Sequence, residues 1–599
     1  MEHSSGNRSQ TLTLGLHRRL TTVMQKAPRG SPVVLPVLLI IAPFLWGSPA
    51  RGDKIDNYVK ARMEKEHIPG LSLAVVNKGR VVKVKGYGYA DLELHVPATP
   101  NTAYQVGSVT KQFTAAAIMI LVQENKVGLD QKISKYMPGT PETWKDITVR
   151  QLLTHTSGLQ GDSPTTPKAL FADYTQDEIL KSSMDLPLLS PPGTKFSYSN
   201  LGFNLLAIII EEVSGKSYAD FLRERIFQPL GMTATTVNDR YAVTPNRAQG
   251  LLWIDGRLRV CQPYSATKYM GSASILSTVV DLAKWDASLD TDKILTATSR
   301  NQMWTSAKLV DGTATGYGFG WYTSSLKKHS YIHHNGAMNG FEANISRFPD
   351  DKLTVIVLVN QSGLAATEKI ATGVARSYVP AIRPTIQGKA PSFLKLDPSV
   401  YPAYAGRYEW WNNYMFTVTP GALGLLGQLP GGEADEYRPV GATSFWQPDD
   451  GVHITIVKNP SGEVTGLRVK QDDGWERTIP RIGPLFHSLT RQPDSDPSRT
   501  QRVATALKAM GSGSKEVGED PNIAPGRKKE FSSPNGAFVG LTSLTFIAAE
   551  NVAGRGIERH NEKVSQILYY KLITDNATRN VLVYLTASDL VADTDVVED

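Results

Sequence analysis

The segment 110–125 constrains the fold of this chain more than any other feature. It consists of helix-forming residues and is apolar on nearly every side, with Phe113, Ile118 and Leu121 among its members. A helix that is apolar all round has no face to offer to water, so it lies at the centre of a domain. The sequence therefore predicts a domain built around one buried helix, with other elements covering it on all sides.

Segments on both sides of this helix have the patterns of β-strands. A hairpin is predicted early, with strands at 71–76 and 81–84 on either side of turn residues. Strand patterns return much later, and a helix follows them; these segments are 318–322, 342–348, 353–359 and, for the helix, 365–378. Residues between the early and late strands are mostly helices and loops. If all these strands join one antiparallel sheet, the first domain is α/β (α+β), with helices flanking the sheet and an all-α insertion.

The remaining sequence predicts further domains, as expected for 599 residues at roughly 150 residues per domain. The first domain is expected over 54–385. Short strand patterns with Gly, Pro and Asp turns then predict a small antiparallel β-barrel-like domain over 398–483. Residues 484–530 have the composition of a linker with one short helix, and 531–599 predict a small α+β domain of unknown role.

The N-terminus has the pattern of an export signal. Basic residues precede an apolar run at 33–46, which is interrupted by Pro36 and Pro43. This run is shorter than the roughly 20 apolar residues of a spanning helix. Small residues up to Ala50 then suit a signal peptidase. We expect a signal peptide over 1–50 and an exported protein, periplasmic or secreted; the alternative is an uncleaved membrane anchor.

Composition and motifs exclude several classes of function. The net charge of +7 is partly a property of the N-terminal segment, so it does not indicate a nucleic-acid partner. Cys261 is the only cysteine, which excludes an intrachain disulfide and any CxxC metal or redox site. The sequence contains no HExxH motif and no P-loop. We therefore expect no metal and no cofactor, and a membrane contact only through the N-terminal segment if it stays uncleaved.

Ser108 and Lys111 open the buried helix with the spacing of a nucleophile and its base. The same Ser-x-x-Lys spacing occurs elsewhere, for example at Ser265 and Lys268, so spacing alone means little. Residues at i and i+3 share a helix face, so Lys111 can reach the Ser108 oxygen. A serine hydroxyl needs a base to become a nucleophile, and a buried lysine with a lowered pKa can be that base.

Two further elements follow in order along the chain. Tyr198 and Asn200 lie just before a helix. The Tyr198 phenol can pass protons if nearby cations lower its pKa. The Asn200 amide can both donate and accept hydrogen bonds. His334, Gly336 and Ala337 precede a strand; the glycine lets a substrate approach, and the Ala337 amide can pair with that of Ser108 as an oxyanion hole.

Each element also has a purely structural interpretation. Tyr198 and Asn200 are equally explained as a turn that caps a helix, and His334 as a surface histidine. Short motifs match freely, so each alone favours the structural interpretation. Their occurrence in order, each at a strand or helix boundary, reverses that preference.

Several tracts carry a family resemblance. They are Val106-Gly107-Ser108-Val109-Thr110-Lys111-Gln112-Phe113-Thr114, Val127-Gly128-Leu129-Asp130, Leu152-Leu153-Thr154-His155-Thr156-Ser157-Gly158-Leu159 and His334-Asn335-Gly336-Ala337-Met338-Asn339-Gly340-Phe341. On these, residues from about 54 to 380 resemble the class C β-lactamase-like family of serine hydrolases. That family includes D-alanyl-D-alanine carboxypeptidases, D-aminopeptidases and esterases. The domain at 398–483 resembles the lipocalin-like modules that follow many such hydrolases.

The resemblance implies a role for each site residue. Ser108 would be acylated, Lys111 would assist its deprotonation, and Tyr198 would shuttle protons and act as general base in deacylation. Asn200 would bind the substrate amide, and His334 would line the substrate side of the strand. Gly336 and Ala337 complete the substrate-binding and oxyanion positions, and His155 would have a packing role.

His334 departs from the β-lactamase pattern, which has a lysine there. An unperturbed histidine has a pKa near 6.5 and is largely neutral at pH 7, whereas a lysine is a fixed cation that suits a carboxylate. This favours a peptidase or esterase, unless a local carboxylate keeps His334 charged. The expected partner is a small-molecule or peptide substrate, with peptidoglycan fragments and β-lactams among the candidates. The alternative function is a catalytically weak protein that binds penicillins or cell-wall peptides.

Overall fold

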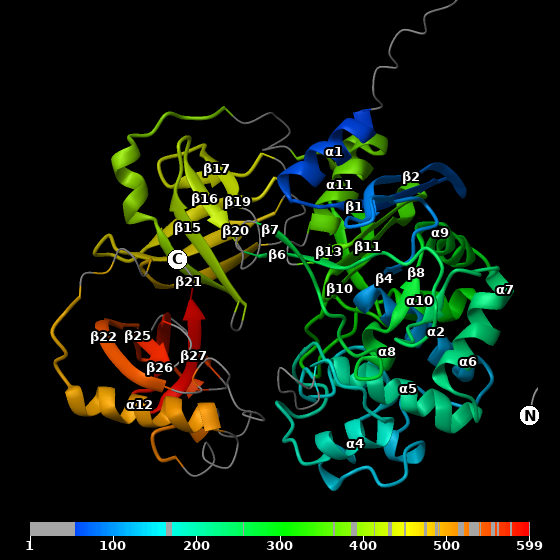
Figure 1. Ribbon diagram of the computed structural model, residues 1–599, viewed down its shortest axis with the longest axis horizontal. Helices are drawn as coiled ribbons and strands as arrows, with labels where there is room; N and C mark the ends of the chain where they lie inside the picture. Colours follow the sequence, from blue (N-terminus) through cyan, green and yellow to red (C-terminus); the bar gives the residue numbers. More distant parts are fainter. Residues whose placement is uncertain are drawn as a thin grey trace, which may run out of the picture. The chain divides into compact units, whose positions relative to one another are not determined.

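The structure is a computed structural model of the chain (Figure 1). It describes residues 54–597 except for short gaps at 163–169, 255–256, 363–365, 385–391, 412–413, 429–433, 449–450, 472–475, 486–488, 490, 513–519, 526–537, 539–540, 553–557, 560–561 and 575–577. The predicted signal peptide lies outside the described residues. Across the described ranges, none of the helices has the length and apolar character needed to cross a membrane.

A mixed-length antiparallel sheet of seven strands forms the framework of the first domain. Its strand order is β3-β2-β1-β12-β11-β10-β9, so the early hairpin joins the late strands through the pair of β1 and β12. The strands are β1 (Gly70–Asn77), β2 (Arg80–Asp91), β3 (Val96–Pro97), β9 (Tyr322–Leu326), β10 (His329–Met338), β11 (Phe341–Phe348) and β12 (Leu353–Val359). The single sheet predicted from the early and late strand patterns is confirmed.

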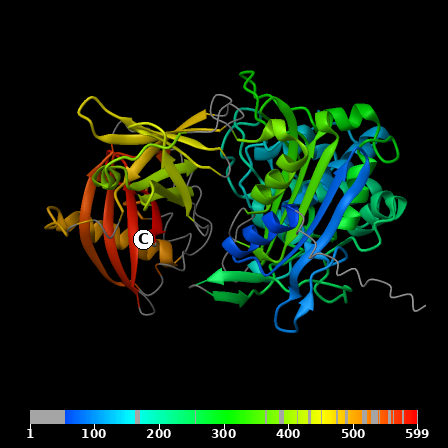
Figure 2. The same ribbon diagram turned by 90° about the horizontal axis from the view of Figure 1, so that it is seen from above.

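Alternating side chains give this sheet two apolar faces. Leu73 and Val75 join a core with the helices α1 (Lys54–Lys65) and α11 (Ala366–Tyr378), whereas Ala74 on the same strand joins a larger core on the opposite face. This is the two-residue period of a strand, which points successive side chains to opposite faces. Figure 2 shows helices on both sides of the strands. The sheet is therefore the middle of three layers.

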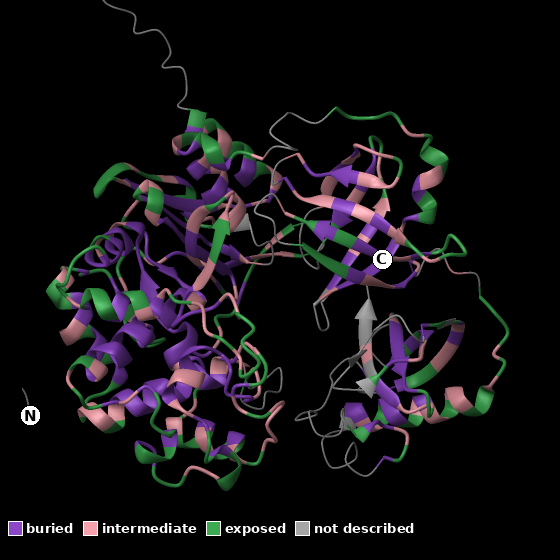
Figure 3. Ribbon diagram, turned by 180° about the vertical axis from the view of Figure 1, so that it is seen from behind, coloured by how far each residue is buried: buried purple, intermediate pink, exposed green. Residues whose placement is uncertain are grey.

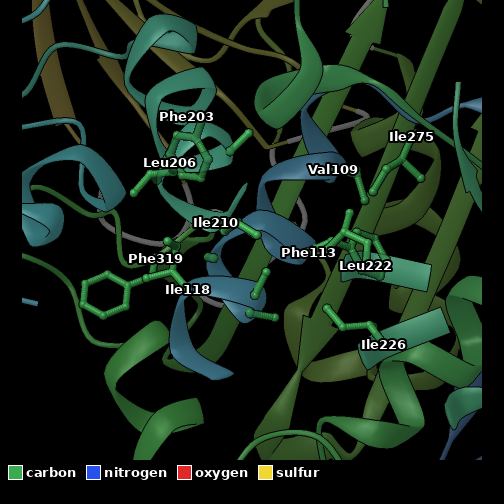
Figure 4. Packing of buried hydrophobic residues seen from close by; sticks show 14 of the residues in the cluster. Val109, Phe113, Ile118, Phe203, Leu206, Ile210, Leu222, Ile226, Ile275 and Phe319 are labelled. Carbon is green, nitrogen blue, oxygen red and sulfur yellow. The ribbon is translucent and has the colours of Figure 1, made fainter. Parts of the chain in front are cut away.

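The helix α2 (Thr110–Gln123) lies at the centre of the larger core. Its residues from Thr110 to Leu121 are all buried, including the polar ones, as predicted for a helix that is apolar all round. Phe113 and Ile118 pack among residues of α5 (Asn200–Ser214), of α6 (Tyr218–Leu222) with the segment after it, and of the loop at Phe319 (Figure 4). Burial colouring shows the contrast between this centre and the outer helices (Figure 3). The buried helix gives the residues at its N-terminus a fixed position.

Residues between α2 and β9 form the predicted, largely helical insertion. Its main helix, α5 (Asn200–Ser214), is buried over most of its length and packs against α2. The other helices are α3 (Val149–Leu153), α4 (Gln176–Met184), α6 (Tyr218–Leu222) with a π-helical continuation at Arg223–Phe227, α7 (Gln228–Leu230), α8 (Met270–Ala273), α9 (Val279–Ser288) and α10 (Ala297–Met303). Short strands accompany them: β4 (Tyr104–Gln105), β5 (Thr236–Val237), β6 (Leu251–Ile254), β7 (Arg257–Val260), β8 (Ile275–Ser277) and β13 (Gln361–Ser362).

One predicted strand begins later than its pattern indicates. The sequence favoured a strand over 318–322, but β9 starts only at Tyr322. Gly320 has a φ of +74°, which an extended strand does not allow, and its Cα lies so close to α2 that a Cβ there would be 2.6 Å from the Lys111 carbonyl oxygen. The apolar residues of this segment therefore belong to a tight loop packed on α2.

The second domain is a closed barrel of eight antiparallel strands. These are β14 (Gly406–Trp411), β15 (Tyr414–Pro420), β16 (Leu425–Gln428), β17 (Asp435–Pro439), β18 (Ser444–Trp446), β19 (His453–Lys458), β20 (Val464–Lys470) and β21 (Glu476–Gly483). Tyr404 and Tyr408 lie in its apolar core, where the Tyr408 hydroxyl donates to the Tyr404 carbonyl at 2.6 Å. The predicted barrel-like domain is confirmed.

The C-terminal domain combines a four-stranded sheet with a helix. The sheet has the order β22-β25-β26-β27, with strands Leu541–Asn551, Gln566–Thr574, Thr578–Leu585 and Val591–Val597, and a separate two-stranded ribbon joins β23 (Glu558–Arg559) to β24 (Glu562–Lys563). The helix α12 (Pro497–Ser512) buries Leu507 and Met510 in the same core as this sheet. The segment predicted to be a linker over 484–530 therefore contributes a core helix to the C-terminal domain.

Candidate active site

Ser108 lies in a short 3-10 turn, Gly107–Val109, that leads directly into α2. Its side chain is half-buried, whereas Lys111 one turn later is fully buried. The Lys111 amine lies 3.1 Å from the Ser108 hydroxyl oxygen. The helical spacing predicted from the sequence thus places the two groups in hydrogen-bond contact.

Three oxygen atoms surround the Lys111 amine. Besides Ser108, it contacts the Asn200 side-chain oxygen at 2.7 Å and the Ser272 carbonyl oxygen at 3.0 Å. Burial lowers the pKa of Lys111 to about 7, although the carboxylate of Asp162 opposes the shift. A neutral amine has two N–H groups and one lone pair. The two carbonyl oxygens can only accept, so they take the two N–H groups, and the lone pair is left for the Ser108 hydroxyl.

Tyr198 brings a phenol to the same place. Lys111 lies 4.7 Å from the centre of its ring, and the Ser108 side chain is near enough to the hydroxyl to oppose part of the rise in the pKa of the phenol. The sequence-based mechanism required nearby cations to lower the pKa of Tyr198. Instead, burial raises its pKa well above the ordinary value, so the phenol stays protonated. Tyr198 can therefore relay a proton, while Lys111 is the group whose pKa suits a base near neutral pH.

His155 has the packing position expected of it. Its ring lies 4.2 Å from the Tyr198 ring, and its Nδ1 atom accepts the Ser199 backbone N–H at 3.0 Å. Burial and the charge of Lys111 hold the pKa of His155 well below its usual value. A neutral His155 thus orients the segment that carries Tyr198 and Asn200.

Asn200 is the first residue of α5, but it does not cap that helix. The cap is Ser199, whose hydroxyl accepts the Gly202 N–H at 3.0 Å. The Asn200 amide is thereby left for the site, where its oxygen accepts from Lys111 and its nitrogen donates to Asp162 at 3.1 Å. The turn around Tyr198 and Asn200 therefore does cap the helix, through Ser199, while the Asn200 side chain has contacts within the site as well.

The backbone beside Ser108 meets the backbone of β10 at two glycines. A Cβ on Gly336 would lie 1.9 Å from the Val106 carbonyl oxygen and 3.0 Å from the Ser108 amide nitrogen. A Cβ on Gly107, whose φ is +51°, would lie 2.5 Å from the Ala337 amide nitrogen. Both positions have room only for glycine. The backbone at Ser108 thus lies directly beside the backbone at Ala337, so the predicted pair of amides comes from two adjacent segments.

His334 points to the same side of β10 as Gly336 and is almost completely buried. It is therefore not the surface histidine of the structural interpretation. Burial, followed by the charge of Lys111, lowers the pKa of His334 to about 3, so the ring is neutral. None of the described carboxylates raises the pKa of His334, and Glu368 faces the preceding histidine, His333.

Three residues of the site escaped the sequence analysis. Ser272 acts through its backbone carbonyl, which no side-chain pattern reveals. Asp162 accepts a hydrogen bond from Asn200 but belongs to no motif, although it closely follows the tract ending at Leu159. Tyr317, whose hydroxyl contacts His334 at 2.9 Å, stands in the tract Tyr317-Gly318-Phe319-Gly320, and its paired glycines were a usable signal of a close approach.

Cys261, the lone thiol, lies apart from this chemistry. It is buried, and its sulfur donates to the Asn339 carbonyl at 3.2 Å. Burial raises its pKa to about 11, which keeps it in the unreactive thiol form.

Comparison with known proteins places this site in a wider group. Residues 55–379 match the family described as Beta-lactamase. Protein flp of Staphylococcus aureus (strain COL) is 30% identical over 316 residues, which cover 51% of this chain and 62% of that protein, less than two thirds of its length. Penicillin-binding protein 4* of Bacillus subtilis (strain 168) is 29% identical over 413 residues, or 64% of this chain and 88% of that protein. The octameric penicillin-binding protein homologue from Pyrococcus abyssi has a TM-score of 0.51 and 25% identity, covering 71% of this chain and 98% of the other.

Proposed function

Because the chain belongs to the β-lactamase family of serine hydrolases, we propose that it forms an acyl-enzyme on Ser108 and hydrolyses D-amino-acid peptides, β-lactams or small esters. The observation that carries this proposal is the setting of Lys111. A fully buried amine with a pKa of about 7 contacts the Ser108 hydroxyl, and two carbonyl oxygens hold its remaining N–H groups.

Acylation starts from the neutral Lys111 amine. The amine takes the Ser108 proton as the Ser108 oxygen attacks the substrate carbonyl carbon, and the carbonyl oxygen becomes an anion. The Ser108 and Ala337 amides, whose backbones approach closely at Gly107 and Gly336, stabilise this anion. The anion then collapses and the bond from the carbonyl carbon to the leaving group breaks, while Tyr198 gives its hydroxyl proton to the leaving group and the Lys111 ammonium restores that proton. The products of this step are the released leaving group and the Ser108 ester.

Deacylation repeats these roles with water as the nucleophile. Water attacks the ester carbon and loses a proton through Tyr198 to the neutral Lys111 amine. The C–O bond to Ser108 breaks, the proton returns to the Ser108 oxygen, and the acid is released. The raised pKa of Tyr198 makes it a relay rather than the final proton acceptor.

A fluorophosphonate probe with peptide mapping tests this function. We expect one adduct, on Ser108, and none in the Ser108→Ala variant. Ser265→Ala is the matched control because it removes the serine of the other buried Ser-x-x-Lys segment, and it should label like the natural chain. Absence of an adduct on Ser108 would remove the enzyme proposal, and an adduct with no turnover of any ester, amide or β-lactam would favour a binding protein.

We also propose that the protein is exported to the periplasm or the medium. The support is the basic N-terminal segment followed by the apolar run at 33–46 and the small residues before Arg51. N-terminal sequencing of the mature protein tests this proposal. A mature chain beginning after Ala50 is expected, and an intact N-terminus on cytoplasmic protein would contradict it.

A further inference from the structure

Both ring nitrogens of His334 are already occupied by groups of the protein. Nε2 lies 2.9 Å from the Tyr317 hydroxyl, and Nδ1 lies 2.6 Å from the Asn335 carbonyl oxygen. The ring itself is about 1% exposed. The side chain at the substrate side of β10 therefore has no nitrogen left over for a ligand.

These two contacts fix how the protons are placed. A carbonyl oxygen can only accept, so Nδ1 must carry the ring hydrogen and donate it to Asn335. Nε2 then has only its lone pair, and the Tyr317 hydroxyl donates to it. Burial and the nearby Lys111 charge oppose a second proton on the ring. The ring consequently offers neither a positive charge nor an N–H group to a substrate carboxylate.

The loop that follows Tyr317 holds its phenol in place. Tyr317 is fully buried, and its ring packs 4.7 Å from His155 and 4.8 Å from Tyr322. Its backbone carbonyl accepts the Ala307 N–H at 2.9 Å. At the next residue, Gly318, a Cβ would lie 2.1 Å from the Met303 carbonyl oxygen, so the backbone is fixed by close packing. The pair of Tyr317 and His334 is preorganised rather than adjustable.

Within the described part of the chain, the other charged groups near the site do not supply a cation in place of a lysine at position 334. Lys111 is committed to Ser108, Asn200 and the Ser272 carbonyl. Asp162, which binds Asn200, brings a negative charge that repels a carboxylate. Among the residues that the structure describes, Lys268 is the other cation that acts on Asp162, and it lies 5.5 Å from the Tyr174 ring centre and 6.0 Å from that of Tyr269.

We propose that Tyr317 is a specificity-determining residue, which locks His334 as a neutral acceptor so that the site selects substrates whose leaving group carries no carboxylate. This inference rests on the proposed function of Ser108. It narrows the substrates to neutral esters, thioesters and amides, and disfavours β-lactams and peptides with a free D-Ala terminus. The physical reason is that a carboxylate buried beside a neutral pair loses its hydration without gaining a charged partner.

The test is a matched pair of thioesters that differ in one group. N-benzoylglycine is joined to mercaptoacetamide in the first and to mercaptoacetate in the second, and thiol release gives kcat/KM for each. For the natural chain we expect the amide thioester to be preferred by about tenfold or more. His334→Lys should reverse the preference, because it puts a cation where the neutral ring stood.

Tyr317→Phe tests the locking hydroxyl and keeps the ring. It leaves Nε2 without its donor, so the ring can take up a proton beside a carboxylate, and the preference should fall at least about threefold. Tyr322→Phe is the matched control, since its ring also packs against His334, at 5.1 Å between centres, and none of the hydrogen bonds described for it reaches the imidazole. The preference should survive in this control.

The outcomes separate this inference from the proposed function. If fluorophosphonate leaves Ser108 unlabelled and neither thioester is cleaved, the proposed function fails and the inference with it. Labelling of Ser108 by fluorophosphonate would support the proposed function by itself. The inference alone is then overturned by any of three results: equal rates for the two thioesters, a preference for the carboxylate thioester, or no acyl adduct from either thioester when the intact protein is measured by mass spectrometry. A carboxylate preference that disappears in Lys268→Met would assign carboxylate recognition to Lys268 instead.

Discussion

Two Ser-x-x-Lys segments of the same domain have the same spacing, and both are largely buried, yet only one pairs its serine with its lysine. Ser108 starts the turn into α2, and the Lys111 amine reaches its hydroxyl at 3.1 Å. Ser265 lies in a turn before α8, and its hydroxyl accepts the Lys268 backbone N–H at 3.2 Å instead. The first serine faces an amine, whereas the second acts as a local cap of its own turn.

The difference comes from the backbone that carries each segment. On a helix, residues three apart share a face, so the lysine side chain folds back over the serine. In the turn at Ser265, the hydroxyl is also engaged by Asp173 at 3.1 Å and Thr267 at 3.0 Å, and the Lys268 amine lies over tyrosine rings. The Ser-x-x-Lys motif therefore brings its amine to its hydroxyl where it leads into a helix, and not in the turn at Ser265.

Replacing the two lysines by methionine should break this comparison most strongly. We expect Lys111→Met to slow acylation of Ser108 about 10²- to 10⁴-fold, the range for loss of a general base. Lys268→Met should change the rate with a neutral ester less than about tenfold, because its amine lies over the Tyr174 and Tyr269 rings. Stopped-flow measurement of acylation gives both rates. Equal losses in the two variants would show that Lys111 is not the base.

Removing the Tyr198 hydroxyl should give a smaller effect, and chiefly on the second half-reaction. Tyr198→Phe deletes the relay beside Ser108, so deacylation should slow about 10- to 100-fold, and more than acylation does. Tyr174→Phe is the control at the second segment, where the ring faces Lys268, and it should leave both steps nearly unchanged. Single-turnover kinetics with a chromogenic ester separates the steps. An acylation defect as large as the deacylation defect would contradict the relay.

The local part of this structure was predictable from the sequence. The alternation at 71–76 and the apolar run at 110–125 indicated β1 and α2, because burial on one face or on all faces leaves a direct pattern in the chain. The start of β9 was misplaced, since apolar residues after Gly318 pack on α2 as a loop. The helix α12 was predicted, but its role in the C-terminal core was not, because partners distant in sequence decide that role.

The site residues likewise include some contacts that the sequence predicts and others that it does not. Ser108 and Lys111 are three residues apart, so helical geometry alone brought them together. Asn200 meets Lys111 from 89 residues away, and only order and boundary positions hinted at the contact. The Tyr317 partner of His334 and the raised pKa of Tyr198 were not predictable, because both follow from the degree of burial in the assembled core. Sequence patterns report which groups are present, whereas protonation states depend on packing.

The pH dependence of acylation gives the smallest effect and the finest distinction between the two lysines. The pKa of Lys111 is lowered to about 7, so the amine is mostly protonated at pH 6 and mostly neutral at pH 8, and only the neutral form can take the Ser108 proton. The rate should therefore rise about tenfold between pH 6 and pH 8, with a midpoint near 7. His155 and His334 do not contribute, because burial keeps both rings neutral across this range.

Two variants test whether Lys111 is the group whose pKa sets the midpoint of the pH profile. Asp162→Asn should move the midpoint to lower pH, because the Asp162 carboxylate favours the charged form of Lys111. Lys268→Met should leave the midpoint near its place, although burial lowers the pKa of Lys268 as well. Acylation rates of a neutral ester across pH 5.5 to 9 measure all three profiles. If the midpoint shifts in Lys268→Met but not in Asp162→Asn, the base is Lys268 and not Lys111.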